Sequence, residues 1–378
     1  MIYFDSSATS LVKPIEVKTA VRDAINFYTA NPGRSGHRLS IKVAEKIYNV
    51  REKVKSFMSA QNYDVIFTKN CTEAINLAIR GLLKSGDHVI STKYEHNSVL
   101  RTLEYMRSLG VEITIVYDDM DTLAVGIEKA IKSNTKLIIT THVSNVTGDV
   151  CDVMEIKKIC DKYNVNYLVD GAQACGHFDI NLDEFGVDLY AFAGHKGLLA
   201  ITGVGGLIVK KDLKLNPVMF GGTGTDSSNL IQPNDTVEGF EAGTLPTVSI
   251  ISLGAGVDYL SKNFQKIVKK EEKLSRYLYD SLKNLTFLRI YSKNNCSNIV
   301  SFNMLGLDSA TLSNCLNQDF KICTRAGLHC APLIHKSLGT GIIGAVRVSI
   351  DFTNKFEEID YLVSCLKQIN RTLNEVCK

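Results

Sequence analysis

Three consecutive segments decide the fold of this chain: LIITTH (Leu137–His142), VMEIKKICDKY (Val153–Tyr163) and YLVD (Tyr167–Asp170). The first and third are short, apolar and partly β-branched, which is typical of strands buried on both faces. The middle segment repeats its apolar residues at the spacing of an amphipathic helix. A strand, a crossover helix and a second strand predict a βαβ unit, in which the two strands lie parallel in one sheet.

The same alternation extends on both sides of this unit, from about residue 64 to residue 210. Helix-length segments such as Glu73–Leu83 and Ser98–Leu109 separate most of the apolar runs. The chain therefore predicts an α/β fold built on a mainly parallel, seven-stranded sheet. The five further strands expected in this sheet are Val65–Thr68, His88–Thr92, Glu112–Tyr117, Leu189–Phe192 and Gly206–Val209.

The pattern changes after about residue 246, where the segment Val248–Leu285 predicts one long helix or two. The later elements read from the pattern are strands at Asn298–Asn303 and Ala345–Ile350 and helices at Ser309–Asn317 and Glu357–Val376. We therefore expect a large domain over residues 31–246 and a smaller α+β domain over residues 247–378. The N-terminal segment, residues 1–30, is expected to pack near the small domain.

The composition excludes several classes of protein. The 43 Lys and Arg residues nearly balance the 40 Asp and Glu residues, for a net charge of +3, so neither nucleic acid nor a membrane surface is an expected partner. No run approaches the roughly 18 apolar residues of a membrane span, and the N-terminus lacks the features of a signal peptide. The ten cysteines are scattered without a C-x-x-C pair, which indicates free thiols in a reducing cytoplasm and no metal site.

Polar clusters follow five of the predicted strands. In open α/β sheets, ligands bind beyond the carboxyl ends of the strands. Side chains that follow neighbouring strands therefore meet at one edge of the sheet, and we expect a single shared cleft. The clusters are TKNCT (Thr68–Thr72), YEHN (Tyr94–Asn97), HVSN (His142–Asn145), DGAQ (Asp170–Gln173) and AGHK (Ala193–Lys196).

Lys196 and Asp170 are the charged residues best placed to do chemistry in this cleft. Most lysines are surface residues, but a desolvated lysine that loses its proton can form a Schiff base with a carbonyl group. A carboxylate at the end of a buried strand needs a partner, so Asp170 is either a helix cap or structural ion pair, or the partner of a protonated pyridine nitrogen. The second alternative, together with a Schiff-base lysine, points to pyridoxal phosphate (PLP).

Four other residues could complete such a cofactor site. Thr72 opens a predicted helix that either Asn70 or Thr72 caps, and the free N–H groups of a helix N-terminus also attract a phosphate. His96 is either an ordinary loop histidine or a ring that stacks on an aromatic cofactor and moves a proton. Asn145 and Gln173 carry amides that could bond a ring hydroxyl.

Taken in order, these residues resemble the class V aminotransferase family of fold-type I PLP enzymes, and within it the cysteine desulfurases of the SufS/CsdB-like group. The resemblance covers nearly the whole chain, and the ordered set of motifs is far more specific than any one of them. The motifs are FDSSAT (Phe4–Thr9), NPGRSGHRLS (Asn31–Ser40), CTEAINLA (Cys71–Ala78), EHN (Glu95–Asn97), SNVTG (Ser144–Gly148), VDGAQ (Val169–Gln173), GHK (Gly194–Lys196), FEAGT (Phe240–Thr244), RAGLHCA (Arg325–Ala331) and VRVSIDFTN (Val346–Asn354).

The resemblance implies a role for each matching residue. Lys196 would hold PLP as a Schiff base, and Asp170 would pair with the pyridine nitrogen. Gln173 would bond the ring oxygen with Asn145 nearby, and His96 would stack on the ring. The remaining implied positions are Thr72, His195 and Cys71 at the cofactor, Thr244 at the phosphate of the second subunit of a homodimer, and Arg347, Arg325 and Asn145 at the substrate.

Cys330 is the residue to which the resemblance gives the decisive role. Taken alone it is an ordinary loop cysteine, but RAGLHC matches the place of the family's sulfur acceptor. The implied reaction converts L-cysteine to L-alanine and leaves the sulfur on Cys330 as a persulfide. The attacking form is the thiolate, which His329 or Arg325 nearby would favour. The segment APLIH follows Cys330 directly, which predicts a sheltered persulfide and transfer to a small acceptor protein.

The chain departs from the family pattern at several positions. Ala193 stands where relatives usually offer a hydroxyl to the phosphate, so one phosphate hydrogen bond is expected to be missing. Cys71 stands where many relatives have threonine or alanine, and Leu328 where a second histidine is frequent. The loop GGTGTDS (Gly221–Ser227) differs from the usual glycine-rich loop, and a threonine within it could replace the lost donor.

Other functions stay open on the sequence. A selenocysteine lyase, another class V aminotransferase or another β-eliminating PLP enzyme would use the same fold, and a transaminase would not need Cys330. A homologue that binds only PLP or a protein partner is a third class, against which the intact set of Lys196, Asp170, Cys330 and Arg347 weighs. The sequence leaves iron–sulfur cluster assembly, thiolated RNA and selenium metabolism as destinations of the sulfur.

Overall fold

The structure is a computed structural model that describes residues 1–33, 35–225, 228–293 and 297–376, so the motif residues Arg34, Asp226 and Ser227 lie outside the described residues. The strands are β1 (Ile2–Tyr3), β2 (Tyr63–Thr68), β3 (His88–Thr92), β4 (Glu112–Val116), β5 (Thr135–Thr141), β6 (Asn166–Asp170), β7 (Leu189–Ala193), β8 (Gly205–Lys210), β9 (Leu288–Ile290), β10 (Ile299–Met304), β11 (Ile322–Cys323), β12 (Arg325–Gly327) and β13 (Ala345–Ser349). The helices are α1 (Ile15–Phe27), α2 (Arg38–Phe57), α3 (Cys71–Leu82), α4 (Asn97–Ser108), the 3-10 turn η1 (Met120–Thr122), α5 (Leu123–Lys129), α6 (Val153–Tyr163), α7 (Leu182–Phe185), α8 (Val237–Phe240), α9 (Thr247–Lys283), α10 (Ser309–Phe320), α11 (Pro332–Ser337) and α12 (Phe356–Val376). Within this described part of the chain, no helix is long and apolar enough to cross a membrane.

Seven strands form the central sheet in the order β2-β8-β7-β6-β5-β3-β4. The strands from β7 to β4 run parallel to one another, whereas β8 is antiparallel to both of its neighbours. This confirms the predicted α/β fold with a mainly parallel, seven-stranded sheet. The parallel strands all end at one edge of the sheet, which is the edge at which the five polar clusters were expected to meet.

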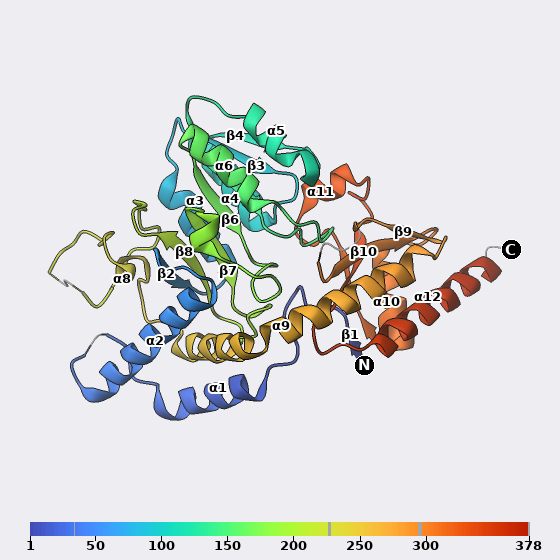
Figure 1. The fold of residues 1–378 in the computed structure, drawn as a ribbon, viewed down its shortest axis with the longest axis horizontal. Helices are drawn as coiled ribbons and strands as arrows, with labels where there is room; N and C mark the ends of the chain where they lie inside the picture. The colour runs from blue at the N-terminus through green and yellow to red at the C-terminus, as the bar shows by residue number, and fades with distance from the viewer. Residues whose placement is uncertain (34, 226–227, 294–296, 377–378) are drawn as a thin grey trace.

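Helices cover both faces of this sheet and form an apolar core on each (Figure 1). On one face α2, α6 and α9 pack against strand side chains such as Tyr167 and Phe192. On the other face α3 and α4 pack against strand side chains such as Ile66 and Leu168. Because both faces are buried, the strands read as apolar runs without polar alternation.

A smaller antiparallel sheet, in the order β12-β13-β10-β9, lies in the C-terminal part of the chain. The long helix α9 runs from the central sheet to this unit, where α10 and α12 complete a third apolar core (Figure 1). The segment Val248–Leu285, for which the sequence predicted one long helix or two, therefore forms the single helix α9. Gly256 lies where a Cβ would come within 2.2 Å of the main-chain oxygen of Leu198, so glycine permits a close approach there without breaking the helix.

The N-terminal segment packs against the C-terminal part of the chain. Strand β1 pairs in parallel with β11, and Asp5 forms an isolated bridge with Ser349. Phe4 is fully buried in the third core, and α1 packs along α9. The packing of residues 1–30 near a small domain and the division of the chain into domains at residues 30 and 246 both stay predictions.

The boundaries of the predicted elements follow the sequence closely, but several short elements and one long helix were not predicted. The helix α6 and the strand β3 have the predicted limits, and β4 ends one residue before the predicted limit, at Val116. Helix α2 was not predicted. Its buried residues Val43, Ile47, Val50 and Val54 recur at helical spacing, so the signal was present in the sequence.

Candidate functional site

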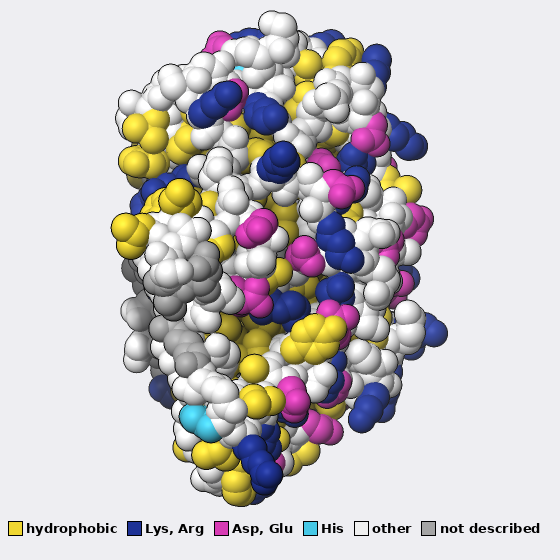
Figure 2. Space-filling view, turned by 90° about the vertical axis from the view of Figure 1, so that its left-hand side faces the viewer, with side chains coloured by type: hydrophobic (Ala, Val, Ile, Leu, Met, Phe, Trp, Pro, Cys, Tyr) yellow, Lys and Arg dark blue, Asp and Glu magenta, His cyan; other side chains and the backbone are white. Residues whose placement is uncertain are grey.

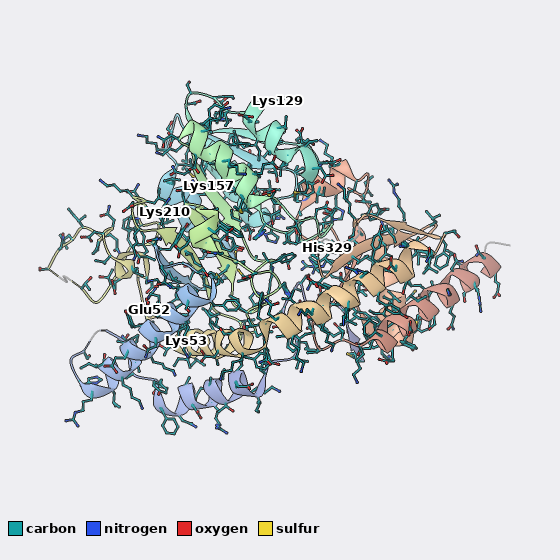
Figure 3. The ribbon with its side chains drawn as sticks, in the orientation of Figure 1. Glu52, Lys53, Lys129, Lys157, Lys210 and His329 are labelled. Atoms are coloured by element: carbon teal, nitrogen blue, oxygen red, sulfur yellow. The ribbon has the colours of Figure 1, made fainter. Side chains whose placement is uncertain are left out.

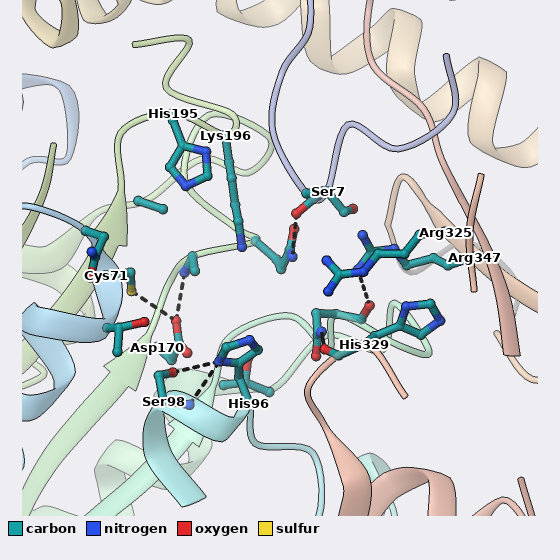
Figure 4. Close-up of a pocket in the computed structure, with 18 residues that line it drawn as sticks. Ser7, Cys71, His96, Ser98, Asp170, His195, Lys196, Arg325, His329 and Arg347 are labelled. Carbon is teal, nitrogen blue, oxygen red and sulfur yellow. Dashed lines mark hydrogen bonds between the residues drawn. The ribbon is translucent and has the colours of Figure 1, made fainter. Parts of the chain in front are cut away.

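A cavity of about 230 Å³ opens at the carboxyl ends of the central strands, where the C-terminal unit closes over them. Figure 4 shows Cys71, Asp170 and Lys196 toward one end of it and Arg325, Arg347 and His329 toward the other. The predicted site residues that line the cavity are Cys71, Thr72, His96, Asn145, Asp170, Gln173, His195, Lys196, Arg325 and Arg347. Cys330 and Thr244 do not line it.

Lys196 reaches into the cavity from the turn that follows β7 (Figure 4). Burial lowers the pKa of its amine, an effect that the carboxylate of Asp170 partly offsets. An amine with a lowered pKa loses its proton more readily, as Schiff-base formation and proton transfer require.

The N-terminal segment holds this turn in place. Four donors converge on the main-chain oxygen of His195, directly before Lys196, at 3.0–3.2 Å: the N–H and the hydroxyl of Ser10, the hydroxyl of Thr9 and the amine of Lys13. The motif FDSSAT had marked part of this segment, but the sequence assigned none of its residues a role. Burial lowers the pKa of Lys13 to about 8.

Asp170 ends β6 and is buried at the end of the cavity that Cys71 and Lys196 also line. We call this the cofactor end, because the cofactor is expected there. Its Oδ1 accepts hydrogen bonds from the main-chain N–H of Ala172 (3.0 Å) and from the thiol of Cys71 (3.5 Å). Burial and the charge of Asp170 raise the pKa of the Cys71 thiol well above its ordinary value, so the thiol stays protonated and donates. A buried carboxylate oriented in this way is a fitting partner for a cation in the cavity.

The N-terminus of α3 opens onto the same end. The side-chain oxygen of Asn70 accepts from the N–H of Glu73 at 2.9 Å, so Asn70 and not Thr72 caps the helix. The N–H groups of Cys71 and Thr72 belong to the first helical turn, which lacks intrahelical acceptors and favours an anion. Ala193 lines the cavity without a hydroxyl, in agreement with the expected loss of one phosphate donor.

Two histidines face this end, and both are neutral near pH 7. Burial lowers the pKa of His96, whose Nδ1 accepts from the main-chain N–H of Ser98 at 3.0 Å. The proton of the neutral ring therefore lies on Nε2. Burial also lowers the pKa of His195, to about 4, and its Nδ1 lies 3.1 Å from the hydroxyl of Thr9.

The amide side chains of Gln173 and Asn145 line the cavity, and each already donates one hydrogen bond to the protein. Gln173 Nε2 donates to the main-chain oxygen of Ser7 at 3.1 Å, and Asn145 Nδ2 donates to the main-chain oxygen of His329 at 2.7 Å. Since an amide nitrogen carries two protons, each side chain retains one N–H for a ligand oxygen.

Arg347, in β13, is the charged group at the other end. Its side chain is only 1% exposed; Nη2 pairs with Asp5 Oδ1 at 2.9 Å and Nη1 donates to the main-chain oxygen of Asn145 at 3.0 Å. Its buried Nε has no partner among the residues that the structure describes. Asp5 is a residue that the sequence did not assign to the site, although it lies within a quoted motif.

Cys330 lies in a strained loop just outside this end. His329 and Cys330 both adopt positive φ angles, of 49° and 58°, which non-glycine residues rarely do. The Cys330 thiol is half-buried, and Arg325 Nη2 lies 3.9 Å from its sulfur. The main-chain oxygen of Cys330 accepts from the N–H of Asn97 at 2.6 Å, which ties the loop to the residue after His96.

His329 does not carry a positive charge beside Cys330, although the sequence had left either His329 or Arg325 as the group that favours the thiolate. Burial, with the nearby charge of Arg347, lowers the pKa of His329 to about 2, so the ring is neutral. Figure 3 shows His329 between the central sheet and the small unit, where its Nε2 contacts the main-chain oxygen of Ala345 at 3.0 Å. Arg325 is therefore the cation beside Cys330.

Thr244 lies outside the cavity of its own chain. Its side chain is exposed, in the segment between α8 and α9. The neighbouring Thr223 and Thr225 line a different hollow, together with Arg51 and Glu241. None of these threonines therefore replaces the missing phosphate donor within the same chain.

The residues of the cavity fit PLP. A buried carboxylate suits a pyridinium nitrogen, a lysine with a lowered pKa suits the aldehyde, and the first turn of α3 suits the phosphate. The free amide N–H groups of Gln173 and Asn145 suit a ring oxygen. No part of this set requires a metal ion, and among the described residues no cluster of His, Cys, Asp or Glu could hold one.

The comparisons with known proteins agree with this geometry. The chain matches the family described as Aminotransferase class-V over residues 2–362. It is 35% identical to a probable cysteine desulfurase of Methanothermobacter thermautotrophicus, over 97% of this chain and 94% of the relative, and 34% identical to a probable cysteine desulfurase of Pyrococcus abyssi, over 99% and 95%.

Solved structures give the same result. The apo cysteine desulfurase from Thermococcus onnurineus NA1 superposes with a TM-score of 0.88 at 33% identity, over 97% of this chain and 94% of that chain. The cysteine desulfurase CsdA from Escherichia coli superposes with a TM-score of 0.86 at 25% identity, over 98% and 94%. The resemblance drawn from the motifs is thus confirmed, and the chain belongs to the class-V aminotransferase family of PLP-dependent enzymes.

Proposed function

We propose that the protein is a cysteine desulfurase, which converts L-cysteine to L-alanine and moves the sulfur onto Cys330. The observation that carries the proposal is the Cys330 thiol beside Arg325, a residue that lines the cavity at the end away from Lys196 and Asp170 (Figure 4). A transaminase needs no thiol there. The relatives that the chain matches over nearly its full length are cysteine desulfurases.

The cofactor end would bind and orient PLP through residues of this chain. Lys196 would hold the aldehyde carbon, Asp170 the pyridine nitrogen, and Gln173 and Asn145 the ring oxygen. His96 would face the ring, while Thr72 and His195, with the first turn of α3, would hold the phosphate. Cys71 would act by donating to Asp170 and so orienting its carboxylate. When bound, PLP supplies an electron sink for the charge that develops at the substrate's α-carbon.

The other end would bind the substrate by its carboxylate. Arg347 presents a guanidinium that Asp5 and the oxygen of Asn145 already orient, which lowers the entropy lost on binding. Arg325 adds a second positive charge at this end. With the carboxylate held here, Lys196 would take the α-proton, because the low pKa of its amine leaves it able to accept one.

Sulfur transfer then requires an attack by Cys330. The Cys330 thiolate forms an S–S bond with the substrate sulfur as the C–S bond of the substrate breaks. The electron pair of the broken bond stays with the β-carbon, which takes a proton to complete alanine. Arg325 favours the thiolate through its charge, since the thiol itself is a poor nucleophile.

A homodimer would complete the site at the phosphate. Thr244 is exposed and distant from its own cavity, which suits a contact with the second subunit. Phe220, Leu230 and Ile231, on the loop after β8, are 73–101% exposed, and a second copy would cover them. Figure 2 faces the side that carries α8 and α2, and there hydrophobic and charged side chains surround a hollow.

A small sulfur-acceptor protein would receive the persulfide. The half-buried thiol in a loop directly followed by α11 suits a docked acceptor better than release into water. All cysteines in the described part of the chain are free, which fits the reducing cytoplasm and destinations such as iron–sulfur cluster assembly.

The test is an assay of alanine and persulfide formation from cysteine by the purified protein with bound PLP. We expect Cys330→Ser to retain PLP but to form neither persulfide nor alanine at a measurable rate. Cys315→Ser, which removes another partly exposed thiol on α10, serves as the matched control and should leave both products unchanged.

Undiminished alanine from the Cys330→Ser protein would contradict the proposal. If the same protein then acted on selenocysteine, a selenocysteine lyase would be favoured, because selenium leaves without the help of a thiol. Products from amino-acid and keto-acid pairs would favour a transaminase. Bound PLP without any turnover in the wild-type protein would favour the partner-binding homologue.

A further inference from the structure

A buried pair of titratable side chains lies beside the turn that carries Lys196, outside the lining of the 230 Å³ cavity. His177 Nδ1 lies 2.8 Å from Glu271 Oε2, and the two side chains are 11% and 5% exposed. His177 follows β6 by a few residues, whereas Glu271 lies on α9. No step of the proposed reaction uses either residue.

His177 packs directly against the main chain of the residue after Lys196. A Cβ placed on Gly197 would lie 2.8 Å from both Cδ2 and Nε2 of the imidazole and 2.1 Å from the main-chain oxygen of Cys175. Because even a methyl group would clash there, the turn has little room to shift toward the imidazole. The position of the imidazole therefore limits the position of Lys196.

Glu271 carries the connection to the small unit. Its second oxygen, Oε1, accepts from the main-chain N–H of Phe352 at 3.1 Å, just beyond β13. Because β13 holds Arg347, one carboxylate joins the imidazole behind Lys196 to the segment that continues from the carboxylate anchor. These contacts connect the turn of Lys196, at one end of the cavity, with the segment that follows β13 and Arg347, at the other end.

On the side that faces Lys196, the space beside the pair is too small to be a binding site, although His177 and Glu271 also line a separate hollow of about 460 Å³. The cavity that Lys196, His177, Glu271 and Phe352 share with their neighbours has a volume of about 10 Å³, which is at most the room for one water molecule. Burial lowers the pKa of His177, but the charge of Glu271 outweighs it and raises the pKa above its ordinary value. A buried, hydrogen-bonded pair resists separation, since each member would lose its partner in a poorly solvated place.

We propose that His177 and Glu271 form a positioning pair that fixes the amine of Lys196 relative to the guanidinium of Arg347. The inference rests on the proposed function, because it matters only if Lys196 must meet a substrate held by Arg347. The pair touches neither substrate nor cofactor, so its effect on the reaction passes through the turn that it supports.

The experiment compares His177→Gln, Glu271→Gln, Glu271→Ala and the double variant His177→Gln/Glu271→Gln with the wild-type PLP-loaded protein. Glu271→Gln keeps an oxygen for the N–H of Phe352 but removes the charge, so it serves as the conservative variant. His88→Gln is the matched control, because His88 is a fully buried histidine at the opposite end of the strands, between the hydroxyls of Thr135 and Thr114.

Two quantities are measured per bound PLP: kcat and KM for cysteine, and the visible circular dichroism of bound PLP, which reports the cofactor's orientation. We expect kcat and kcat/KM to fall together by about tenfold in His177→Gln and further in Glu271→Ala, with a partial return in Glu271→Gln. The double variant should be no worse than the worse single variant, because the two residues act as one unit. The dichroism should change in each variant but not in His88→Gln.

A kcat per bound PLP and a dichroism that match those of His88→Gln would overturn the inference, even if the melting temperature falls. Strictly additive losses in the double variant would also overturn it. If Glu271→Ala does not fold, His177→Gln and Glu271→Gln still decide the question. If the wild-type protein forms no alanine, the proposed function fails, while the dichroism still reports whether the pair positions Lys196.

Discussion

The two ends of the cavity are built in different ways. At the cofactor end, Lys196, Asp170 and the start of α3 all lie at one edge of the central sheet, and the N-terminal segment adds hydrogen bonds to the turn of Lys196. At the other end, which we call the sulfur end, Arg347 depends on Asp5, and Cys330 lies in a loop with two positive φ angles. The main residues of the first end come from one sheet, whereas the second end is assembled from separate units of the chain.

The difference matches two chemical needs. A cofactor that stays bound through every turnover benefits from donors that are already in place, as strand ends and helix N-termini provide. A sulfur that must leave needs a thiol that is neither fully buried nor fully open, and the half-buried Cys330 is placed in that way. Donors already in place at one end, and a half-buried thiol in a strained loop beside the other, therefore suit one cofactor and a sulfur atom that must be passed on.

The largest expected effect lies at the cofactor end. Lys196→Ala should abolish turnover and the PLP that borohydride fixes to the protein, because Lys196 is the only lysine that lines the cavity among the described residues. The measurement is mass spectrometry of the reduced protein beside an alanine assay. Lys129→Ala, an exposed lysine shown in Figure 3, is the control and should keep both properties. Fixation of PLP at another residue would contradict the assignment of Lys196, and with it the assignment of this end of the cavity to the cofactor.

The second prediction concerns Glu95, which is fully buried beneath the cofactor end. Its Oε1 accepts from Thr92 and from the N–H of Thr141, while burial, reinforced by the charge of Asp170, raises its pKa to about 8. The folded protein holds the proton of Glu95 more tightly than the unfolded chain does, so the protonated carboxyl stabilises the folded protein. This contribution to the free energy of unfolding is fully present below pH 4.5 and is lost as the pH rises through about 8.

Glu95→Gln should remove this loss, because the amide is neutral at every pH. Between pH 5 and 8 the free energy of unfolding of the wild-type protein should fall relative to that of the variant, by roughly 3–4 kcal/mol in total. Urea unfolding at a series of pH values measures the difference. Glu104→Gln, which makes the same change at an exposed position of α4, is the control. A difference independent of pH would mean that Glu95 is ionised in the folded protein.

The third prediction concerns the support of the sulfur end. Asp5→Asn should lower the free energy of unfolding by about 2 kcal/mol, because Arg347 is left as a buried cation without its counter-charge. The amount of bound PLP should stay the same, since the cofactor end does not use Asp5. Asp23→Asn, which breaks an exposed pair with Arg22, should have no measurable effect. Loss of PLP in Asp5→Asn would show that the two ends are not independent.

The smallest expected effect concerns the thiol itself. Arg325→Gln should slow the alkylation of Cys330 by iodoacetamide about fivefold, the effect of roughly 1 kcal/mol from one partly exposed charge. Arg325→Lys retains the charge and should alkylate nearly as fast as the wild-type protein. Mass spectrometry of the peptide that contains Cys330 gives the rates. Equal rates in all three proteins would assign the reactivity of the thiol to the strained loop rather than to Arg325.

Local patterns in the sequence determined the cofactor end. The apolar runs that end in Asp170 and before Lys196 are short-range features, and the rule that parallel strands end at one edge is enough to bring them together. A helix start near Asn70 and Thr72 also follows from neighbouring residues, whereas the missing hydroxyl at Ala193 follows from the resemblance to the family. Only the choice between Asn70 and Thr72 as the cap needed the structure.

Tertiary structure alone decided the partners that lie far apart in the chain. Asp5 and Arg347 are 342 residues apart, and His177 and Glu271 are 94 apart, so no periodicity relates them. The neutral state of His329 likewise depends on burial by segments that the sequence around it does not contain. Strand and helix patterns report only the face that each segment buries, whereas ion pairs and pKa shifts depend on which segments pack together, and that is determined by the whole fold.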